Sequence, residues 1–180
     1  MRAGSDGPPP VLLIAAVVLA LTATGVMLAI AATRRTPQQP VTIAGVPAPQ
    51  AQSPACHALL DALPQRLGDY TRAPAAQPAP PGTAAWRRDS EPVVLRCGLD
   101  RPPDFVVGSP IQVVDGVQWF EVTDPHAGDA GRSTWYTVDR PVYVALTLPP
   151  GSGPAPIQEL SDLIGHTLAA VPIRPAPPSG

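Results

Sequence analysis

Apolar residues in this chain form one long block, followed by shorter segments in which apolar and polar positions alternate. The block covers residues 11–32, VLLIAAVVLALTATGVMLAIAA, and holds 22 residues without a charge. At roughly 1.5 Å per residue a helix of this length reaches about 33 Å, enough to cross a hydrocarbon core of about 30 Å. A cleaved signal peptide is the main alternative, and Ala29-Ile30-Ala31 resembles a cleavage site, but its apolar region runs only about 7 to 15 residues. The pattern predicts a transmembrane helix at 11–32 after a short stub, residues 1–10.

Proline-rich segments lie on both sides of the remaining chain. Residues 33–53 have no helical or strand period and contain many prolines, which predicts a semi-extended linker. Residues 172–180 have a similar composition and too few large apolar residues to bury a core, so we expect a disordered tail. Residues 54–171 remain as one domain of ordinary size.

Two segments of this domain have the period of an amphipathic helix. Ser53 is a suitable N-cap for a helix that begins at Pro54, and Pro64 ends or kinks it. A second helix is expected from about Ile157 to Ala170. The apolar stripes are Cys56, Leu59, Leu60, Leu63 and Leu67 in the first helix, and Ile157, Leu160, Leu163, Ile164 and Leu168 in the second.

Alternating residues between these helices predict about five strands. Asp115-Gly116 is a strong signal for a two-residue hairpin turn between the second and third of them. The strands are 92–98, 111–114, 117–122, 133–138 and 142–148. A helix, about five antiparallel strands and a second helix predict a two-layer α+β domain with both helices on one face of the sheet.

The first hairpin has two apolar faces. One face carries Ile111, Val113, Phe120 and Val122, and the other carries Val114, Val117 and Trp119. The first set is the better core candidate, which leaves Trp119 on the uncovered face together with Tyr143 and, if the register of its strand allows, Trp135. Exposed aromatic side chains can stack on a sugar ring or anchor a protein partner. The alternative is that loops or linkers cover them.

The two cysteines each lie on the core-facing side of their predicted element. Cys56 is in the first helix and Cys97 is in strand 92–98, so they could meet at bonding distance and form a disulfide in an oxidising compartment. Two unlinked buried thiols are the alternative. A catalytic thiol is disfavoured because His57, next to Cys56 on the helix, points about 100° away from it.

Charge bears on orientation and on the class of partner. Arg34 and Arg35 follow the apolar block and only Arg2 precedes it, which by the positive-inside rule favours a cytoplasmic domain. We nevertheless expect the stub to be cytoplasmic and the domain to be exported, because the paired cysteines favour an oxidising compartment. From Pro54 to Pro172 there are 8 Arg and 13 acidic residues, a formal charge of −5, so nucleic acid is not an expected partner.

Motifs for known chemistry are missing from the sequence. It contains no Gly-x-Ser-x-Gly, no Ser-x-x-Lys and no His-Glu-x-x-His. Asp124, His126 and Asp129 bring an imidazole and two carboxylates into one loop, which supports an alternative interpretation as a hydrolase or transferase of cell-wall precursors. Such a Pro/Gly/Asp loop is more typical of a turn, so we expect no catalytic residue, no cofactor and no metal.

Several short motifs together resemble a known family. They are CHALLDALP at 56–64, AW at 85–86, PVVLRCG at 92–98, DGVQW at 115–119 and RPVYV at 140–144. With the N-terminal apolar block, they resemble an actinobacterial family of membrane-anchored or secreted proteins of unknown function, over about residues 54–170. The resemblance implies a place in the cell envelope with the domain outside the membrane, and it implies no reaction.

The sequence thus predicts a single-pass protein of the cell membrane with a domain on the extracytoplasmic side. We expect this domain to be non-catalytic and to bind a protein partner or a cell-wall glycan through Trp119, Tyr143 and Trp135.

Overall fold

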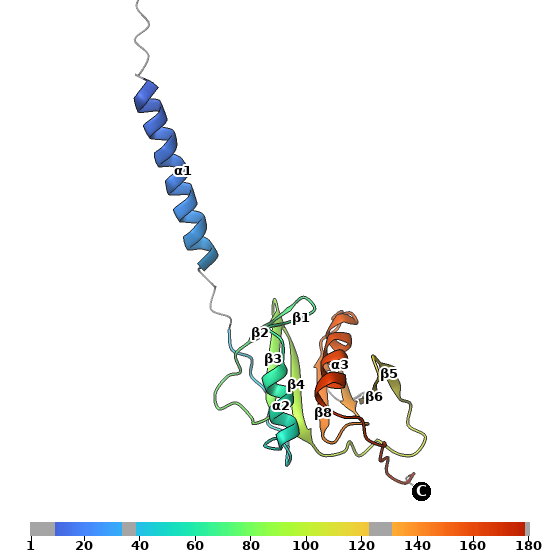
Figure 1. Ribbon diagram of the computed structural model, residues 1–180. Coiled ribbons are helices and arrows are strands. Elements are labelled where there is room, and N and C mark those ends of the chain that lie inside the picture. Colours follow the sequence, from blue (N-terminus) through green and yellow to red (C-terminus); the bar gives the residue numbers. More distant parts are fainter. Residues whose placement is uncertain (1–9, 34–38, 123–130, 179–180) are drawn as a thin grey trace, which may run out of the picture. The chain divides into compact units, whose positions relative to one another are not determined.

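The computed structural model describes residues 10–33, 39–122 and 131–178 (Figure 1). The chain divides into two compact units, Met1–Pro37 and Gln38–Gly180. Each unit is described by itself below.

In the first unit the apolar block forms the helix α1 (Pro10–Thr33), which is 24 residues long. Its described large apolar side chains are exposed, from 54% at Val18 to 74% at Met27. Among the residues that the structure describes, no helix combines the length and apolar character needed to cross a membrane.

The second unit is built on one eight-stranded sheet in which all strand pairs are antiparallel. Its strands are β1 (Arg66–Leu67), β2 (Tyr70–Ala73), β3 (Thr83–Arg88), β4 (Glu91–Leu99), β5 (Gln112–Val114), β6 (Val117–Val122), β7 (Ser133–Thr137) and β8 (Tyr143–Leu148). The spatial order is β1-β2-β3-β4-β8-β7-β6-β5. The sheet therefore consists of two meanders, β1–β4 and β5–β8, that join through the pair of β4 and β8.

The prediction of about five strands is wrong, because β1, β2 and β3 were not expected. β1 has only 2 residues, and β2 and β3 consist largely of alanine, arginine and threonine, without an alternating apolar pattern. The strands that were predicted, β4 to β8, are confirmed. The hairpin register is confirmed as well, since Val114 pairs with Val117 and Gln112 with Trp119.

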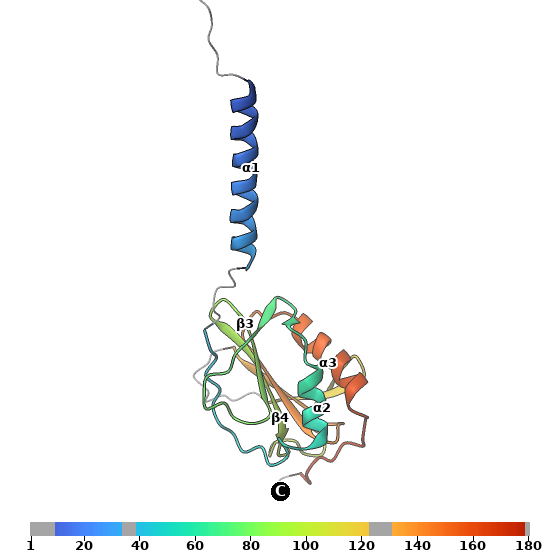
Figure 2. The same ribbon diagram turned by 60° about the vertical axis from the view of Figure 1, so that its left-hand side comes forward.

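Two helices cover one face of this sheet, as predicted (Figure 2). α2 (Pro54–Ala62) is capped by the Ser53 side chain, whose Oγ accepts a hydrogen bond from the Cys56 amide at 3.3 Å. α3 (Ala155–Thr167) directs the predicted stripe of the second helix at the strands. The predicted α+β architecture is thus confirmed, with eight strands in place of five.

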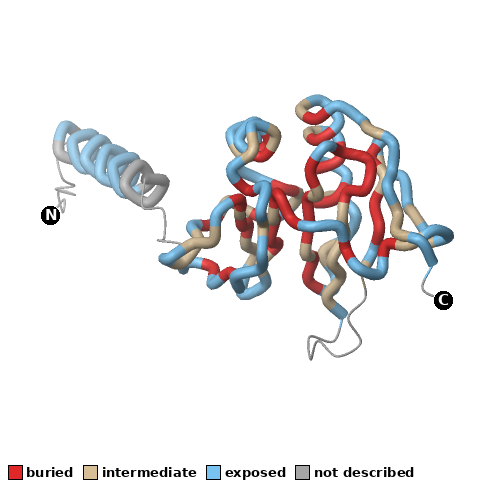
Figure 3. The backbone as a smooth tube through the Cα atoms, turned by 90° about the horizontal axis from the view of Figure 1, so that it is seen from below, coloured by how far each residue is buried: buried red, intermediate tan, exposed pale blue. Residues whose placement is uncertain are grey.

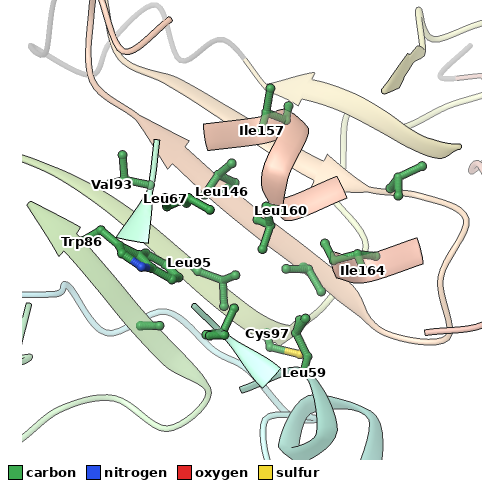
Figure 4. Packing of buried hydrophobic residues seen from close by; sticks show 14 of the residues in the cluster. Leu59, Leu67, Trp86, Val93, Leu95, Cys97, Leu146, Ile157, Leu160 and Ile164 are labelled. Atoms are coloured by element: carbon green, nitrogen blue, oxygen red, sulfur yellow. The ribbon is translucent and has the colours of Figure 1, made fainter. Parts of the chain in front are cut away.

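The main core lies between the two helices and the sheet. In Figure 4, Leu160 and Ile164 of α3 lie over Leu146 of β8, and Leu59 of α2 lies beside Cys97 of β4. All five of these residues are fully buried. Figure 3 shows that the buried residues follow the strands and the sheet-facing sides of the two helices.

A smaller apolar cluster covers the opposite face of the sheet at β2 to β4. It consists of Val41, Ile43, Ala73, Ala85 and Val94. Val41 also binds the chain next to β2, since its amide donates to the Pro74 carbonyl at 2.8 Å and its carbonyl accepts from the Ala76 amide at 2.9 Å. The predicted linker 33–53 is therefore too long, because the chain packs on the domain from Val41 onwards. Val41 and Ile43, which make this contact, are isolated apolar residues and show no helical or strand period in the sequence.

The same segment contacts β4 again at Gly98. The Gln50 amide donates to the Gly98 carbonyl at 3.0 Å, and Gly98 has a φ of +87°. A Cβ at this position would collide with the Ala51 nitrogen and the Gln50 carbonyl carbon. Glycine is thus required here both by the backbone angle and by the close approach of a second chain segment.

The C-terminal segment also belongs to the folded unit. The Ala176 amide donates to the Phe105 carbonyl at 2.9 Å, and the Val107 amide donates to the Ala176 carbonyl at 2.8 Å. The prediction of a disordered tail at 172–180 is therefore wrong for the described residues up to 178. Backbone hydrogen bonds hold this segment, and the sequence pattern of side chains does not reveal such bonds.

Candidate functional site

The predicted disulfide between Cys56 and Cys97 is confirmed. Its two Cα atoms are 5.7 Å apart, and both residues have no exposed surface. It joins α2 to β4 beneath the main core, so its role in this structure is to hold the helix on the sheet. No free cysteine is present.

The interpretation of Trp119 as an exposed contact residue is wrong. Trp119 is fully buried in the main core, and its Nε1 donates to Ser161 Oγ of α3 at 2.9 Å. Ser161 in turn donates to the Ile157 carbonyl at 2.7 Å. The sheet is covered on both faces at this hairpin. The prediction that the side with Phe120 faces the main core is therefore wrong, because the side with Trp119 does. Phe120 of the other side packs in a separate cluster with Phe105 and Val138.

The predicted contact residues therefore do not form one surface. Trp135 pairs with Leu146 and lies on the helix-covered face, where it is partly buried against the main core. Tyr143 belongs to the cluster of Phe105 and Phe120 on the opposite face. Each of the two lines its own hollow.

Trp135 lines a groove of about 330 Å³. The indole Nε1 donates to Ser133 Oγ at 2.9 Å, which orients the ring. One wall is the loop 149–154, PPGSGP, and the other walls come from β5, β7 and the start of α3. The described lining residues include none that is charged: they are Gln112, Val114, Gly131, Ser133, Trp135, Leu148, Pro149, Pro150, Gly151, Ser152, Gly153, Pro154 and Ile157.

Tyr143 lines a separate cavity of about 300 Å³. Its other lining residues are Gln50, Val138, Arg140, Pro141, Val171, Pro172 and Arg174. These come from the segment before α2, from the β7–β8 turn and from the C-terminal segment. The segments that were predicted as a linker and a tail therefore contribute three of its lining residues, Gln50, Pro172 and Arg174.

Arg140 in the cavity lining forms a buried ion pair with Asp139, which does not line the cavity. Arg140 Nη1 lies 2.8 Å from Asp139 Oδ2, with side-chain exposures of 3% and 4%. Arg140 also donates from Nη2 to the Gly116 carbonyl at 3.2 Å. Two atoms of the pair, Arg140 Nε and Asp139 Oδ1, have no hydrogen-bond partner in the structure.

Two further arginines act on Tyr143. Burial raises the pKa of the Tyr143 phenol, while the positive charges of Arg101 and Arg174 oppose this rise. Arg101 Nη1 donates to the Arg174 carbonyl at 3.4 Å, which holds the Arg101 side chain at the backbone of Arg174. With its pKa raised, the phenol stays protonated at neutral pH and can donate a hydrogen bond.

The centre of the second sheet face is polar. Arg96 donates to Thr147 Oγ1 at 3.5 Å, and the hydroxyls of Thr134 and Thr147 are 3.1 Å apart. Burial lowers the pKa of Arg96, and the neighbouring Tyr136 opposes this shift. Arg96 Nε in this cluster is buried and has no hydrogen-bond partner in the structure.

Residues with metal-binding or catalytic potential do not gather in the described part of the chain. No group of three or more His, Cys, Asp or Glu side chains there could hold a metal ion. Asp124, His126 and Asp129, the candidates of the enzymatic alternative, lie outside the described residues. His166 is held by its own helix through a 2.7 Å contact of Nδ1 with the Asp162 carbonyl.

Two of the cavity residues were missed as site residues by the sequence interpretation. Arg140 stands beside Tyr143 in the motif RPVYV, and an arginine next to proline in a predicted turn gave no sign that it is buried. Arg174 lies in the segment expected to be disordered. The one sequence signal that could have marked Arg174 as a site residue is its isolated charge within a proline-rich segment.

Comparisons with known proteins give one match. A family model described as "Protein of unknown function (DUF3515)" matches residues 15–173. The matched range contains the complete Trp135 groove and every lining residue of the Tyr143 cavity except Arg174. No curated protein and no solved structure matches the chain.

Proposed function

Because the chain belongs to the DUF3515 family of proteins of unknown function, we propose a function from its own residues: a membrane-anchored, non-catalytic domain that binds cell-wall glycan outside the membrane. The Trp135 groove carries this proposal. Two parts of it are separable, the anchoring of α1 in the membrane and the binding in the groove, and each has its own test.

The uninterrupted uncharged sequence 11–32 supports the anchor. Side chains are described for only part of this stretch, but its described large apolar side chains are exposed to a degree that a water-soluble helix avoids. The disulfide supports an extracytoplasmic domain, since such bonds persist in oxidising compartments. This argument from the disulfide outweighs the positive-inside rule, because Arg34 and Arg35 give only a small charge difference across the helix.

We expect the full chain to stay with the membrane pellet after alkaline carbonate extraction of the cells that produce it. The variant Val18→Asp/Leu19→Asp places two charges in the middle of the block and should release the protein into the supernatant, because each charge at the bilayer centre costs about 2.5–3.5 kcal/mol. Protease added to intact wall-free cells should digest the domain. A wild-type chain that carbonate extracts, or a domain that the protease cannot reach, would contradict the anchor or its orientation.

The groove is suited to a neutral, hydroxyl-rich ligand. Trp135 offers a partly exposed indole whose orientation is fixed by Ser133, and flat aromatic faces stack on the C–H surface of sugar rings. Gln112 adds an exposed amide that can hydrogen-bond to sugar hydroxyls. The absence of charge from the lining favours a neutral glycan segment over a charged peptide.

Substitution of Trp135 by alanine should weaken the binding of the detergent-solubilised full chain to insoluble cell-wall glycan by about tenfold or more, because a central aromatic contact contributes about 2 kcal/mol. Trp135→Phe keeps an aromatic face and should retain most of the affinity. The measurement is co-sedimentation over a range of glycan concentrations, with the unfolding temperature of each variant recorded beside it.

Two further variants separate binding from folding. Gln112→Glu adds a charge to the groove at an exposed position and should weaken binding without lowering the unfolding temperature. Val113→Ala changes a side chain that is 68% exposed and lies outside the groove lining, so it should bind as the wild type does. Equal glycan binding by the wild type and Gln112→Glu, or no binding by the wild type, would refute glycan binding. Crosslinking in cells that depends on Trp135 and captures a protein would favour a protein partner instead.

A further inference from the structure

The Tyr143 cavity differs from the Trp135 groove in its charge. Among the residues that the structure describes, Arg140 and Arg174 are its only charged lining residues, and no carboxylate lines it. Arg140 is paired with Asp139, but Asp139 itself does not line the cavity. The chain thus turns arginine side chains towards a hollow of about 300 Å³ in a domain whose overall charge is negative.

Arg140 gives the cavity a buried donor without a partner. The residue is 7% exposed, and its Nη1 and Nη2 donate to Asp139 and to the Gly116 carbonyl. Nε, which is itself buried, has no partner in the structure. A buried donor of this kind costs about 1–3 kcal/mol unless a ligand or water accepts from it, and more when the group is charged.

Positive charge at the rim is not neutralised. Arg174 and Arg101 form no ion pair in the described part of the chain, and they act on the same phenol, Tyr143. Both arginines are exposed, Arg174 lines the cavity, and neither has a carboxylate partner among the described residues. Such guanidinium groups attract an anion, because a charge-assisted hydrogen bond is stronger than a neutral one. Tyr143 supplies a neutral hydroxyl donor beside them.

We propose that this cavity is an anion-binding site that takes a phosphate group, held by Arg174 and by the Tyr143 hydroxyl, with Arg140 in the lining and Arg101 next to Arg174. Phosphate fits better than carboxylate because its double charge matches the two unpaired arginines and its oxygens can accept from several donors at once. The size of the cavity, about 300 Å³, admits the phosphate of a small ester but not a bulky head group in full. The site is independent of the glycan proposal, since the two hollows share no lining residue.

The test is isothermal titration of the detergent-solubilised full chain with inorganic phosphate and, separately, with acetate at matched ionic strength. The wild type should bind phosphate more tightly than acetate. Arg174→Gln should weaken phosphate binding by about tenfold or more, as expected for one lost charge-assisted contact. Tyr143→Phe should weaken it by a smaller factor, because it removes one neutral donor.

Arg66→Gln is the matched control, because Arg66 is an exposed arginine on β1 and does not line the cavity. It removes the same charge and should bind phosphate within about twofold of the wild type, as expected for a distant screened charge. The proposal fails if the wild type binds no phosphate, if Arg174→Gln binds it unchanged, or if Arg66→Gln loses as much affinity as Arg174→Gln. Unchanged unfolding temperatures show that the rim variants fold.

The source of the phosphate is identified by displacement. Glycerol 3-phosphate displaces bound inorganic phosphate if the ligand is a soluble ester, and micelles that contain phosphatidylglycerol displace it if the ligand is a lipid head group. If neither displaces it, inorganic phosphate itself is the ligand of the site.

Discussion

Replacement of both Cys56 and Cys97 by alanine is expected to lower the free energy of unfolding by about 4 kcal/mol and the unfolding temperature by about 10–15 °C. The bond closes a loop with a sequence separation of 41, and opening this loop gives the unfolded chain conformations that it now lacks. Both side chains are fully buried, so the alanines also leave part of the space under α2 unfilled. Thermal unfolding followed by circular dichroism measures the change.

Reduction of the wild type separates these two contributions. In the presence of a reducing agent the wild type loses the bond but keeps both sulfur atoms in place, so its unfolding temperature should fall less than that of the double variant. A double variant as stable as the oxidised wild type would contradict a stabilising role of the bond. The single variant Cys97→Ala should behave like the double variant, because a lone Cys56 has no partner.

A comparable loss is expected from Gly98→Ala, about 2–5 kcal/mol. The left-handed φ of +87° costs a residue with a Cβ about 1–2 kcal/mol, and displacement of packed neighbours adds about 1–3 kcal/mol. The added Cβ would collide with Gln50 and Ala51, so the segment before α2 must move away from β4. Chemical unfolding of the full chain in detergent gives the free energy directly.

Gly108→Ala is the matched control for this substitution. Gly108 has a φ of +92°, but a Cβ there would meet nothing within 4 Å. It should therefore lose only the backbone contribution of about 1–2 kcal/mol. If the two variants lose the same amount, the close approach of residues 50 and 51 to Gly98 contributes nothing to stability, contrary to this structure.

The elements that could be predicted from the sequence are those whose side chains carry a period or a cap. Ser53 and Pro54 placed the start of α2, and Asp115-Gly116 placed the β5–β6 turn together with its register. β3 could not be predicted, because its TAAWRR sequence has no period of two and gains its place through pairing with β2 and β4. Pairing with the neighbouring strands leaves no pattern in the sequence of β3 itself.

The face of the β5–β6 hairpin was predicted wrongly for a related reason. Rules for an antiparallel sheet assume one buried face and one exposed face. Here Trp119 packs under α3 while Phe120 packs on Phe105, so both faces carry apolar residues. The choice between them depends on where α3 lies, which the sequence of the hairpin does not contain.

The candidate sites depended on the same long-range information. Tyr143 and Trp135 were chosen for their aromatic character, and the structure lines a hollow with each of them. Other lining residues of the Tyr143 cavity could not be predicted, because Gln50 and Arg174 come from proline-rich segments that were not expected to pack on the domain. Proline lowers the conformational freedom of the unfolded chain and needs no period to lie against a folded domain.

The two strands at the borders of the sheet are also its shortest. β1 has 2 residues and β5 has 3, so each border offers little unpaired backbone. Long exposed edges invite other chains to add a strand, which leads to aggregation, and short edges prevent it. A second molecule therefore cannot bind this domain by extending its sheet at these borders, and recognition falls to side chains such as those of the groove and the cavity.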